Sequence, residues 1–201
     1  MPLWAIVPVK PLRRGKSRLS PLLTEAERTS LNHNLLSNTL RTLSSVNQID
    51  TIMVVSRDPQ ALALAREYGA RTVLENGNPE LNTALKRAAV VAKTYLANEI
   101  LIIPADLPLL TDQEVVTFLN HCGNPPEVVI SPDRRRDGTN MLYINPAGLI
   151  PFNYGIGSFA KHIAEAERIG ARVEIVETPS LGLDLDLPED LELLRIFQEK
   201  K

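Results

Sequence analysis

The sequence predicts an α/β fold in which a mostly parallel sheet is covered by helices on both faces. Segments rich in branched apolar residues alternate with segments in which leucine and alanine recur at helical spacing. The strand segments are apolar at nearly every position, which is typical of a sheet buried on both faces. Because the chain has 201 residues and 44% hydrophobic residues, it can bury one sizeable core, and we expect residues 1–201 to form one domain.

Local signals place the elements of this fold along the chain. The predicted strands are residues 3–9, 51–56, 71–74, 99–104, 127–131, 140–144 and 172–177. Helix starts are predicted where a capping residue precedes an apolar pattern. These starts are the capping box of Thr24 and Glu27, Asp58 before Pro59, the capping box of Thr111 and Glu114, Ser158 as an N-cap, and Pro188. A further helix is predicted over the alanine-rich residues 81–96. Gly69 and Gly170 each end a helix.

Composition excludes several classes of protein. The formal net charge is -2 and the pI is near 6.0, which argues against nucleic-acid binding through bulk charge. The single cysteine, Cys122, cannot form an internal disulfide, as is common in a reducing cytoplasm. The apolar run at residues 1–12 is too short for a signal peptide or a membrane span. We therefore expect a cytoplasmic protein with neither a nucleic-acid nor a membrane partner, and the sequence leaves its oligomeric state open.

Asp106 follows the buried strand at residues 99–104, in the stretch IIPADLPLL, which is stiffened by two prolines. In a parallel sheet, ligands bind outside the carboxyl ends of the strands, and Asp106 falls at that edge. Taken alone, it could equally be a turn residue.

Asp184 and Asp186 alternate with leucines in the stretch LGLDLDLPEDL. Residues two apart in an extended segment point to the same side, so both carboxylates would face one way. Together with Asp106 they suit a hard divalent cation such as Mg²⁺, which prefers oxygen ligands. The alternative is that Asp186 caps the last helix and Asp184 lies in solvent.

The loop after the first strand, VPVKPLRRGKSRL, carries five cationic side chains around one glycine. Such a loop can hold a triphosphate through amides and ammonium groups, although it matches neither the P-loop nor the dinucleotide-binding spacing. Lys10 and Lys16 are the first candidates for phosphate contact, and Arg18 is the third. The alternative is an ordinary solvated basic loop.

A further candidate site runs from DGTN at residues 137–140 to NYGIGSFAKH at residues 153–162. Thr139 offers a hydroxyl, Gly155 allows close approach of the backbone, and Ser158 begins a helix whose free amides favour an anion. His162, one turn into that helix, could face the same anion, although a lone histidine is more often structural. Plain capping by Ser158 is compatible with an anion site.

Five segments together resemble one family, and the resemblance covers nearly the whole chain. They are IVPVKPLRRGKSRL, IIPADLPLL, DRRRDGTNMLYINP, GIGSFAKH and LDLDLPEDL. In this order and spacing they are similar to the 2-phospho-L-lactate (or phosphoenolpyruvate) guanylyltransferases of deazaflavin coenzyme F-420 biosynthesis. The resemblance implies a nucleotidyltransferase fold of the glycosyltransferase-A kind, with a mixed, mostly parallel sheet. It also implies GTP, Mg²⁺ and a phosphorylated three-carbon acid as ligands.

The resemblance also implies a mechanism. The acceptor's phosphate attacks the α-phosphorus of GTP and pyrophosphate leaves, with positioning and electrostatics supplying most of the catalysis. Asp106, Asp184 and Asp186 would hold Mg²⁺, and Lys10 and Lys16 would stabilise the pyrophosphate.

On the same grounds, the acceptor would be held by Thr139, Gly155 and Ser158. Asn82 belongs to a Leu-Asn pair expected near the nucleotide base. The family's glycine-rich approach to that pair is replaced here by Pro79 and Glu80, which leaves the residues that contact the base unassigned.

Two other functions compete with this one. A molybdopterin guanylyltransferase, a cytidylyltransferase or a glycosyltransferase would share the scaffold, and a paired Asp-x-Asp motif also occurs in glycosyltransferases. A non-catalytic GTP sensor could keep the fold without turnover, because fold analogy alone does not fix function. Release of pyrophosphate from GTP separates these possibilities.

Overall fold

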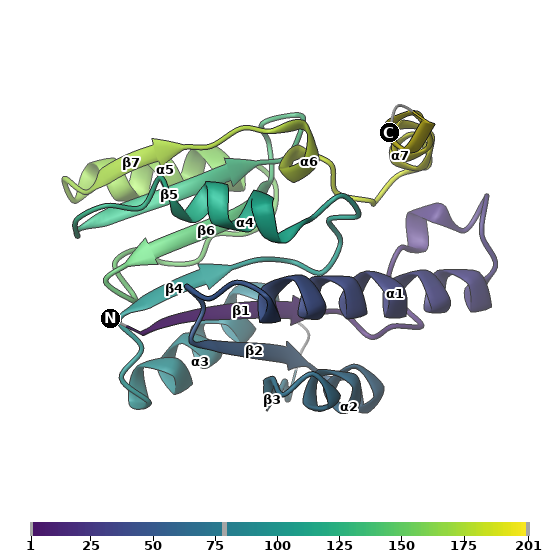
Figure 1. Cartoon of the computed structure of the whole chain (residues 1–201), viewed down its shortest axis with the longest axis horizontal. Coiled ribbons are helices and arrows are strands. Elements are labelled where there is room, and N and C mark those ends of the chain that lie inside the picture. The colour runs from purple at the N-terminus through teal and green to yellow at the C-terminus, as the bar shows by residue number, and fades with distance from the viewer. Residues whose placement is uncertain (1, 78–79, 200–201) are drawn as a thin grey trace.

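The computed structural model describes residues 2–77 and 80–199 and contains a seven-stranded mixed sheet (Figure 1). Its strands are β1 (Leu3–Val9), β2 (Thr51–Ser56), β3 (Arg71–Leu74), β4 (Glu99–Ile102), β5 (Glu127–Pro132), β6 (Thr139–Asn145) and β7 (Arg172–Ile175). Their order across the sheet is β3-β2-β1-β4-β6-β5-β7. Only β6 runs antiparallel to its neighbours, β4 and β5, among the paired strands of the described ranges. The predicted mixed, mostly parallel sheet is therefore confirmed.

Helices cover both faces of the sheet, as predicted. They are η1 (Ser17–Leu19), α1 (Glu25–Ser44), α2 (Pro59–Glu67), α3 (Leu81–Thr94), α4 (Asp112–Leu119), α5 (Ser158–Arg168), α6 (Pro179–Gly182) and α7 (Pro188–Glu199). One core cluster joins α1, α2, α4 and α6 to the sheet, and a second joins α3 and α5 to its other face (Figure 1). None of the helices in the described ranges is long and apolar enough to cross a membrane.

Alternation along β1 shows how the sequence builds both cores at once. Leu3, Ala5 and Val7 belong to the first cluster, whereas Trp4 and Ile6 belong to the second. All five are at most 4% exposed. Because both faces are buried, the strand is apolar at every position, which is the pattern that predicted a doubly covered sheet.

The predicted bounds differ from the structure at five elements: β5 ends at Pro132 rather than 131, β6 spans Thr139–Asn145 rather than 140–144, and three elements end earlier than predicted. β4 ends at Ile102 rather than 104, α3 ends at Thr94 rather than 96, and β7 ends at Ile175 rather than 177. The Thr24–Glu27 capping box forms fully. The Thr111–Glu114 box forms only in part, because the Glu114 carboxylate instead accepts hydrogen bonds from the hydroxyls of Thr178 and Ser180.

The sheet has a topological switch point between β1 and β4. The chain proceeds outward from β1 to β2 and β3, then returns to place β4 on the other side of β1. The loops that follow β1 and β4 leave the same edge of the sheet in opposite directions, which opens a crevice for a ligand. The first-loop cations and Asp106 lie in those two loops.

Candidate active site

The first loop, residues 10–24 between β1 and α1, is fixed by two polar side chains from neighbouring helices. The Leu12 amide donates to the Asp58 carboxylate at 2.7 Å, and the Leu12 carbonyl accepts from the Asn32 amide at 2.7 Å. Gly15 packs against Asn32 so closely that a Cβ there would lie 2.6 Å from the Asn32 side-chain nitrogen. A side chain at this position would therefore displace the Asn32 amide from the Leu12 carbonyl, and the next residue, Lys16, adopts a left-handed conformation with φ 57°.

That conformation directs the Lys16 ammonium between two acidic segments. Its Nζ lies 3.1 Å from an oxygen of Asp106 and 2.9 Å from an oxygen of Asp186, and the side chain is only 7% exposed. Burial lowers the pKa of Lys16, but the two carboxylates raise it by more, so its pKa lies above the ordinary value. Burial likewise raises the pKa of Asp186, but Lys16 outweighs burial and holds that pKa below its usual range.

A main-chain hydrogen bond joins the two acidic segments. The Leu185 amide donates to the Asp106 carbonyl at 3.0 Å. Leu183 and Leu185 are buried, whereas Asp184 is partly exposed, so the predicted alternation holds over this stretch. Residues 179–182, which precede it, form the short helix α6, which the sequence analysis did not predict.

The alternative role of Asp186, capping the last helix, is taken by Asp190. The Asp190 carboxylate accepts from the amides of Asp186 and Leu187 at 3.0 and 2.6 Å. The Asp186 carboxylate bonds to Lys16 instead. Burial, together with Asp106 and Asp186, raises the pKa of Asp184 to about 6, so this edge of the sheet holds more negative charge than Lys16 alone offsets.

The donor set can be tested against a hard divalent cation such as Mg²⁺. One oxygen of Asp106 is buried without a hydrogen-bond partner among the described residues, and the repulsion at Asp184 would be relieved by a cation. Within residues 2–77 and 80–199, however, no three acidic, histidine or cysteine side chains already converge on one point. The residues therefore fit an ion that takes one or two carboxylates and completes its shell with water and phosphate oxygens, rather than a closed protein cage.

Two adjoining cavities open onto this edge. The first, of about 300 Å³, lies against the first loop and is lined by Lys10, Gly15 and Lys16. The second, of about 630 Å³, is lined by Thr139, Gly155 and Ser158, and also by Arg18. Asp106 and Asp186 line both cavities, and Asp184 lines the second. The predicted nucleotide and acceptor residues thus fall on two sides of one acidic junction, except for Arg18 and Asn82.

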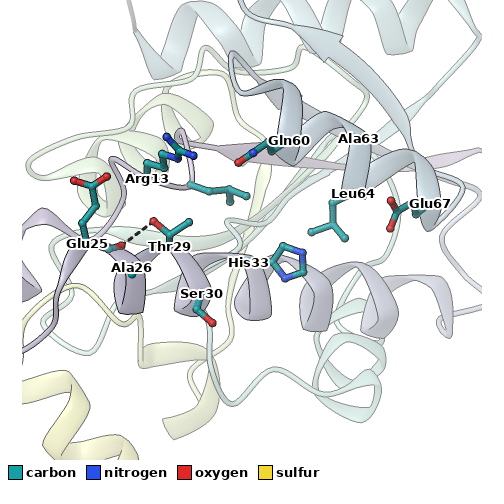
Figure 2. Close-up of a pocket in the computed structure, with 11 residues that line it drawn as sticks. Arg13, Glu25, Ala26, Thr29, Ser30, His33, Gln60, Ala63, Leu64 and Glu67 are labelled. Atoms are coloured by element: carbon teal, nitrogen blue, oxygen red, sulfur yellow. Dashed lines mark hydrogen bonds between the residues drawn. The ribbon is translucent and has the colours of Figure 1, made fainter.

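Arg18 lies on the acceptor side of the junction, where its charge contributes to the low pKa of Asp186. Another first-loop cation, Arg13, faces away from both cavities. Figure 2 shows Arg13 in a separate groove between α1 and α2, together with His33 and Gln60. The cations of this loop therefore do not all face one cavity, which the sequence pattern could not reveal.

Asn82 is not among the described residues that line the two cavities. Its side-chain amide instead bonds to both main-chain groups of Tyr154, accepting from the amide at 2.7 Å and donating to the carbonyl at 3.2 Å. This pair ties α3 to the loop before α5. Glu80 is the N-cap of α3 and accepts from the amides of Asn82 and Thr83, while Pro79 lies outside the described residues. A contact between Asn82 and the nucleotide base stays a prediction.

The N-terminus of α5 differs from the prediction. Gly157, with φ 69°, is the N-cap, and Ser158 is the first helical residue. The first amides are not free for an anion, because that of Gly157 donates to the Asp137 carboxylate, that of Ser158 to the Gly155 carbonyl, and that of Phe159 to the Asp137 carbonyl. The Ser158 hydroxyl, which a capping role would have used, instead donates to Thr139 at 3.2 Å.

Two residues that the sequence analysis missed organise the junction. Asp190 is 3% exposed, and besides binding two amides it pairs with Arg134 at 2.8 Å. An acid at the third position of a helix that begins with proline often accepts from the N-cap amide, so the stretch LPEDL carried a usable signal. Arg134 lines the second cavity, but the run of three arginines gave no means of choosing it.

Comparison with known proteins identifies the family of this chain. The family model described as "Guanylyl transferase CofC like" matches residues 3–201. The chain belongs to this guanylyl transferase family. It is 41% identical to a phosphoenolpyruvate guanylyltransferase from Rubrobacter xylanophilus, over 95% of this chain and 92% of that protein. It is 35% identical to a 2-phospho-L-lactate guanylyltransferase from Methanocaldococcus infernus, over 92% of this chain and 81% of that protein.

Solved structures show the same fold at low sequence identity. A nucleotidyl transferase from Methanothermobacter thermautotroptrophicus has a TM-score of 0.70 and 16% identity, covering 99% of both chains. A glucosyl-3-phosphoglycerate synthase from Mycobacterium tuberculosis, solved with Mn²⁺, uridine diphosphate and phosphoglyceric acid, has a TM-score of 0.65 and 15% identity. The match covers 98% of this chain and 75% of that one. The predicted nucleotidyltransferase fold of the glycosyltransferase-A kind is thus confirmed.

Proposed function

We propose that this guanylyl transferase moves GMP from GTP to the phosphate of a three-carbon phospho-acid, phosphoenolpyruvate or 2-phospho-L-lactate. The observation that carries the proposal is the pair of cavities that share Asp106 and Asp186. One is lined by first-loop ammonium groups suited to a triphosphate, and the other by hydroxyls suited to a small acid. The substrates named for the relatives from R. xylanophilus and M. infernus support this choice of acceptors.

The reaction replaces one phosphoanhydride bond with another. An oxygen of the acceptor phosphate attacks the α-phosphorus of GTP, the bond to the β-phosphate breaks, and pyrophosphate leaves. The attacking oxygen is already anionic, so no side chain needs to remove a proton. Lys10 and Lys16 lie on the nucleotide side, where their ammonium groups would offset the charge that develops on pyrophosphate.

Asp106, together with Asp184 or Asp186, would hold a divalent cation, which when bound screens the repulsion between the nucleotide and acceptor phosphates. In the structure Lys16 occupies the space between Asp106 and Asp186. Binding of the triphosphate gives the ammonium a competing anion, so Lys16 would turn toward the phosphates and release the carboxylates. Thr139, Gly155 and Ser158 would hold the acid group of the acceptor, Ser158 through the hydrogen bond that it donates to Thr139, and Asn82 would act near the base.

The decisive experiment supplies the purified protein with GTP, Mg²⁺ and one of three acids: phosphoenolpyruvate, 2-phospho-L-lactate or 3-phosphoglycerate. Pyrophosphate release is followed for each acid. We expect turnover with one of the first two, with phosphoenolpyruvate slightly preferred and the other accepted more slowly, because one hydroxyl more or less changes specificity only modestly. Bound GTP without pyrophosphate release for any acid would contradict the proposal and favour a sensor. Release with CTP in place of GTP would favour a cytidylyltransferase.

A further inference from the structure

A buried chain of hydrogen bonds connects the loop before α5 to the acceptor cavity. The Asn153 amide donates to Nε2 of His162 at 3.0 Å, and Nδ1 of His162 lies 3.1 Å from the Thr139 hydroxyl. The Ser158 hydroxyl donates to the same Thr139 oxygen at 3.2 Å. His162 is 0% exposed, Ser158 1% and Thr139 6%. Thr139 and Ser158 also line the second cavity, so this chain of hydrogen bonds ends at the cavity wall.

The protonation state of His162 follows from these partners. A main-chain amide can only donate, so Nε2 of His162 must be the unprotonated nitrogen that accepts from Asn153. The proton of the neutral ring is then on Nδ1, and Nδ1 donates to Thr139. The ring of Tyr154 packs edge-on against His162, with centroids 5.0 Å apart, and keeps the imidazole in this orientation.

This arrangement determines the direction of the Thr139 hydroxyl. Its oxygen accepts from His162 on one side and from Ser158 on the other, so its lone pairs are used within the protein. Its own hydrogen is left to point toward the cavity that Thr139 lines. A hydroxyl that accepts two hydrogen bonds is also a better donor, because successive bonds polarise one another.

We infer that His162 is a positioning residue, which through its Nδ1–H makes Thr139 a dedicated hydrogen-bond donor to an anionic oxygen of the acceptor acid. The inference rests on the proposed function, and it assigns to His162 a task that touches neither substrate. Burial, with a smaller effect from Lys161, lowers the pKa of His162 to about 4, so the ring keeps its neutral form at ordinary pH. A neutral hydrogen-bond donor suits the second cavity, because it selects a ligand by the direction of the hydrogen bond rather than by charge alone.

The first test uses the unmodified protein and needs no turnover. The chain has 3 histidines, and ¹⁵N NMR of their imidazole nitrogens distinguishes the two neutral tautomers. We expect the Nδ1-protonated form for His162 at pH 7, identified by the loss of its signals in a His162→Gln variant. The Nε2-protonated tautomer or a charged ring would overturn the inference, whatever the protein catalyses.

The second test compares two substitutions that each keep one of the two bonds. In His162→Asn the amide nitrogen can take the place of Nδ1 and still donate to Thr139. In His162→Gln the amide oxygen can take the place of Nε2 and accept from Asn153, but no donor faces Thr139. We expect His162→Gln to raise the acceptor KM about threefold or more with little change in the GTP KM, and His162→Asn to stay closer to the unmodified protein.

The comparison with Thr139→Val separates positioning from a general loss of structure. Thr139→Val removes the donor itself and should raise the acceptor KM about tenfold. Because His162 acts through Thr139, adding His162→Gln to Thr139→Val should cause little further loss, whereas independent effects would multiply and overturn the inference. Equal impairment in the Gln and Asn variants, with matched Tm values, would overturn it too. Failure of the unmodified protein to use any phospho-acid would instead contradict the proposed function.

Discussion

On the side of the junction that we assign to the nucleotide, Lys16 is held by the carboxylates of Asp106 and Asp186, whereas on the side that we assign to the acceptor, Thr139 is held by the neutral groups of His162 and Ser158. In the first arrangement, the Lys16 ammonium lies within 3.1 Å of both carboxylates, and all three groups carry full charges. The second contains only hydroxyls, an imidazole and a main-chain amide.

This difference indicates how each side responds to a ligand. Ion pairs at Lys16 must exchange partners when phosphates and a cation arrive, because both compete for the same charged groups. The neutral hydrogen bonds at Thr139 need no such exchange, since one donor is left over for the acceptor. We therefore expect the nucleotide side to rearrange on binding and the acceptor side to be largely formed in advance.

The largest effect should come from removing a carboxylate shared by both cavities. Asp106→Asn is expected to reduce kcat/KM about a hundredfold, equivalent to about 3 kcal/mol, with little change in Tm. Steady-state rates across a range of Mg²⁺ concentrations measure this effect. Asp112→Asn, at an exposed acid in the first turn of α4, is the matched control. Near-normal activity of Asp106→Asn with unchanged Mg²⁺ dependence would remove Asp106 from the site.

A smaller effect should separate the two sides of the cleft. Lys16→Ala is expected to raise the KM for GTP about tenfold, and that for the acceptor much less, because the triphosphate carries the larger charge. Arg13→Ala is the control from the same loop, since Arg13 faces the groove between α1 and α2 (Figure 2). An effect of Lys16→Ala confined to the acceptor KM would reverse our assignment of the two cavities.

The smallest effect concerns stability and tests whether the acidic junction between the two cavities is strained without ligands. The pKa of Asp184 is raised to about 6 by burial and by its acidic neighbours, so folding disfavours its charged form. This cost is absent at a pH below the ordinary carboxyl range and fully present above pH 6. Asp184→Asn should therefore stabilise the metal-free protein by about 1 kcal/mol at pH 7.5, after allowance for solvent screening, and by much less at pH 4.

Thermal unfolding in a chelating buffer measures this difference. The same variant is expected to lose most of its turnover with GTP, so stability and activity should change in opposite directions. An Asp184→Asn protein that is less stable than the unmodified protein at pH 7.5 would mean that the acidic edge is not strained.

The sequence predicted the fold well because its signals are local. The apolar runs at β1, β2 and β3 gave the strand bounds directly, and the caps at Thr24 and Asp58 gave the helix starts. The family resemblance implied a mixed sheet, but nothing in the sequence indicated that β6 is the antiparallel strand, since strand direction depends on partners distant in the chain.

The site was predicted less completely, because residue types do not reveal which atoms are already bonded. Thr139 and Ser158 line the cavity as expected, yet the sequence gave no sign that His162 joins Thr139 to Asn153. Asn82 looked equally available for a ligand, but Tyr154 uses both ends of its side-chain amide. Which polar groups bond to one another depends on the folded structure and cannot be read from residue types alone.

The hydrogen bond from Leu185 to the carbonyl of Asp106 has a consequence for how the protein matures during synthesis. All seven strands are complete once Ile175 has been added, but Asp184 and Asp186 come later. A nascent chain that has released β7 from the ribosome therefore contains every strand of the described sheet but still lacks two of the three junction carboxylates. Synthesis thus completes the strands of the sheet before it adds two of the carboxylates that we propose for the metal.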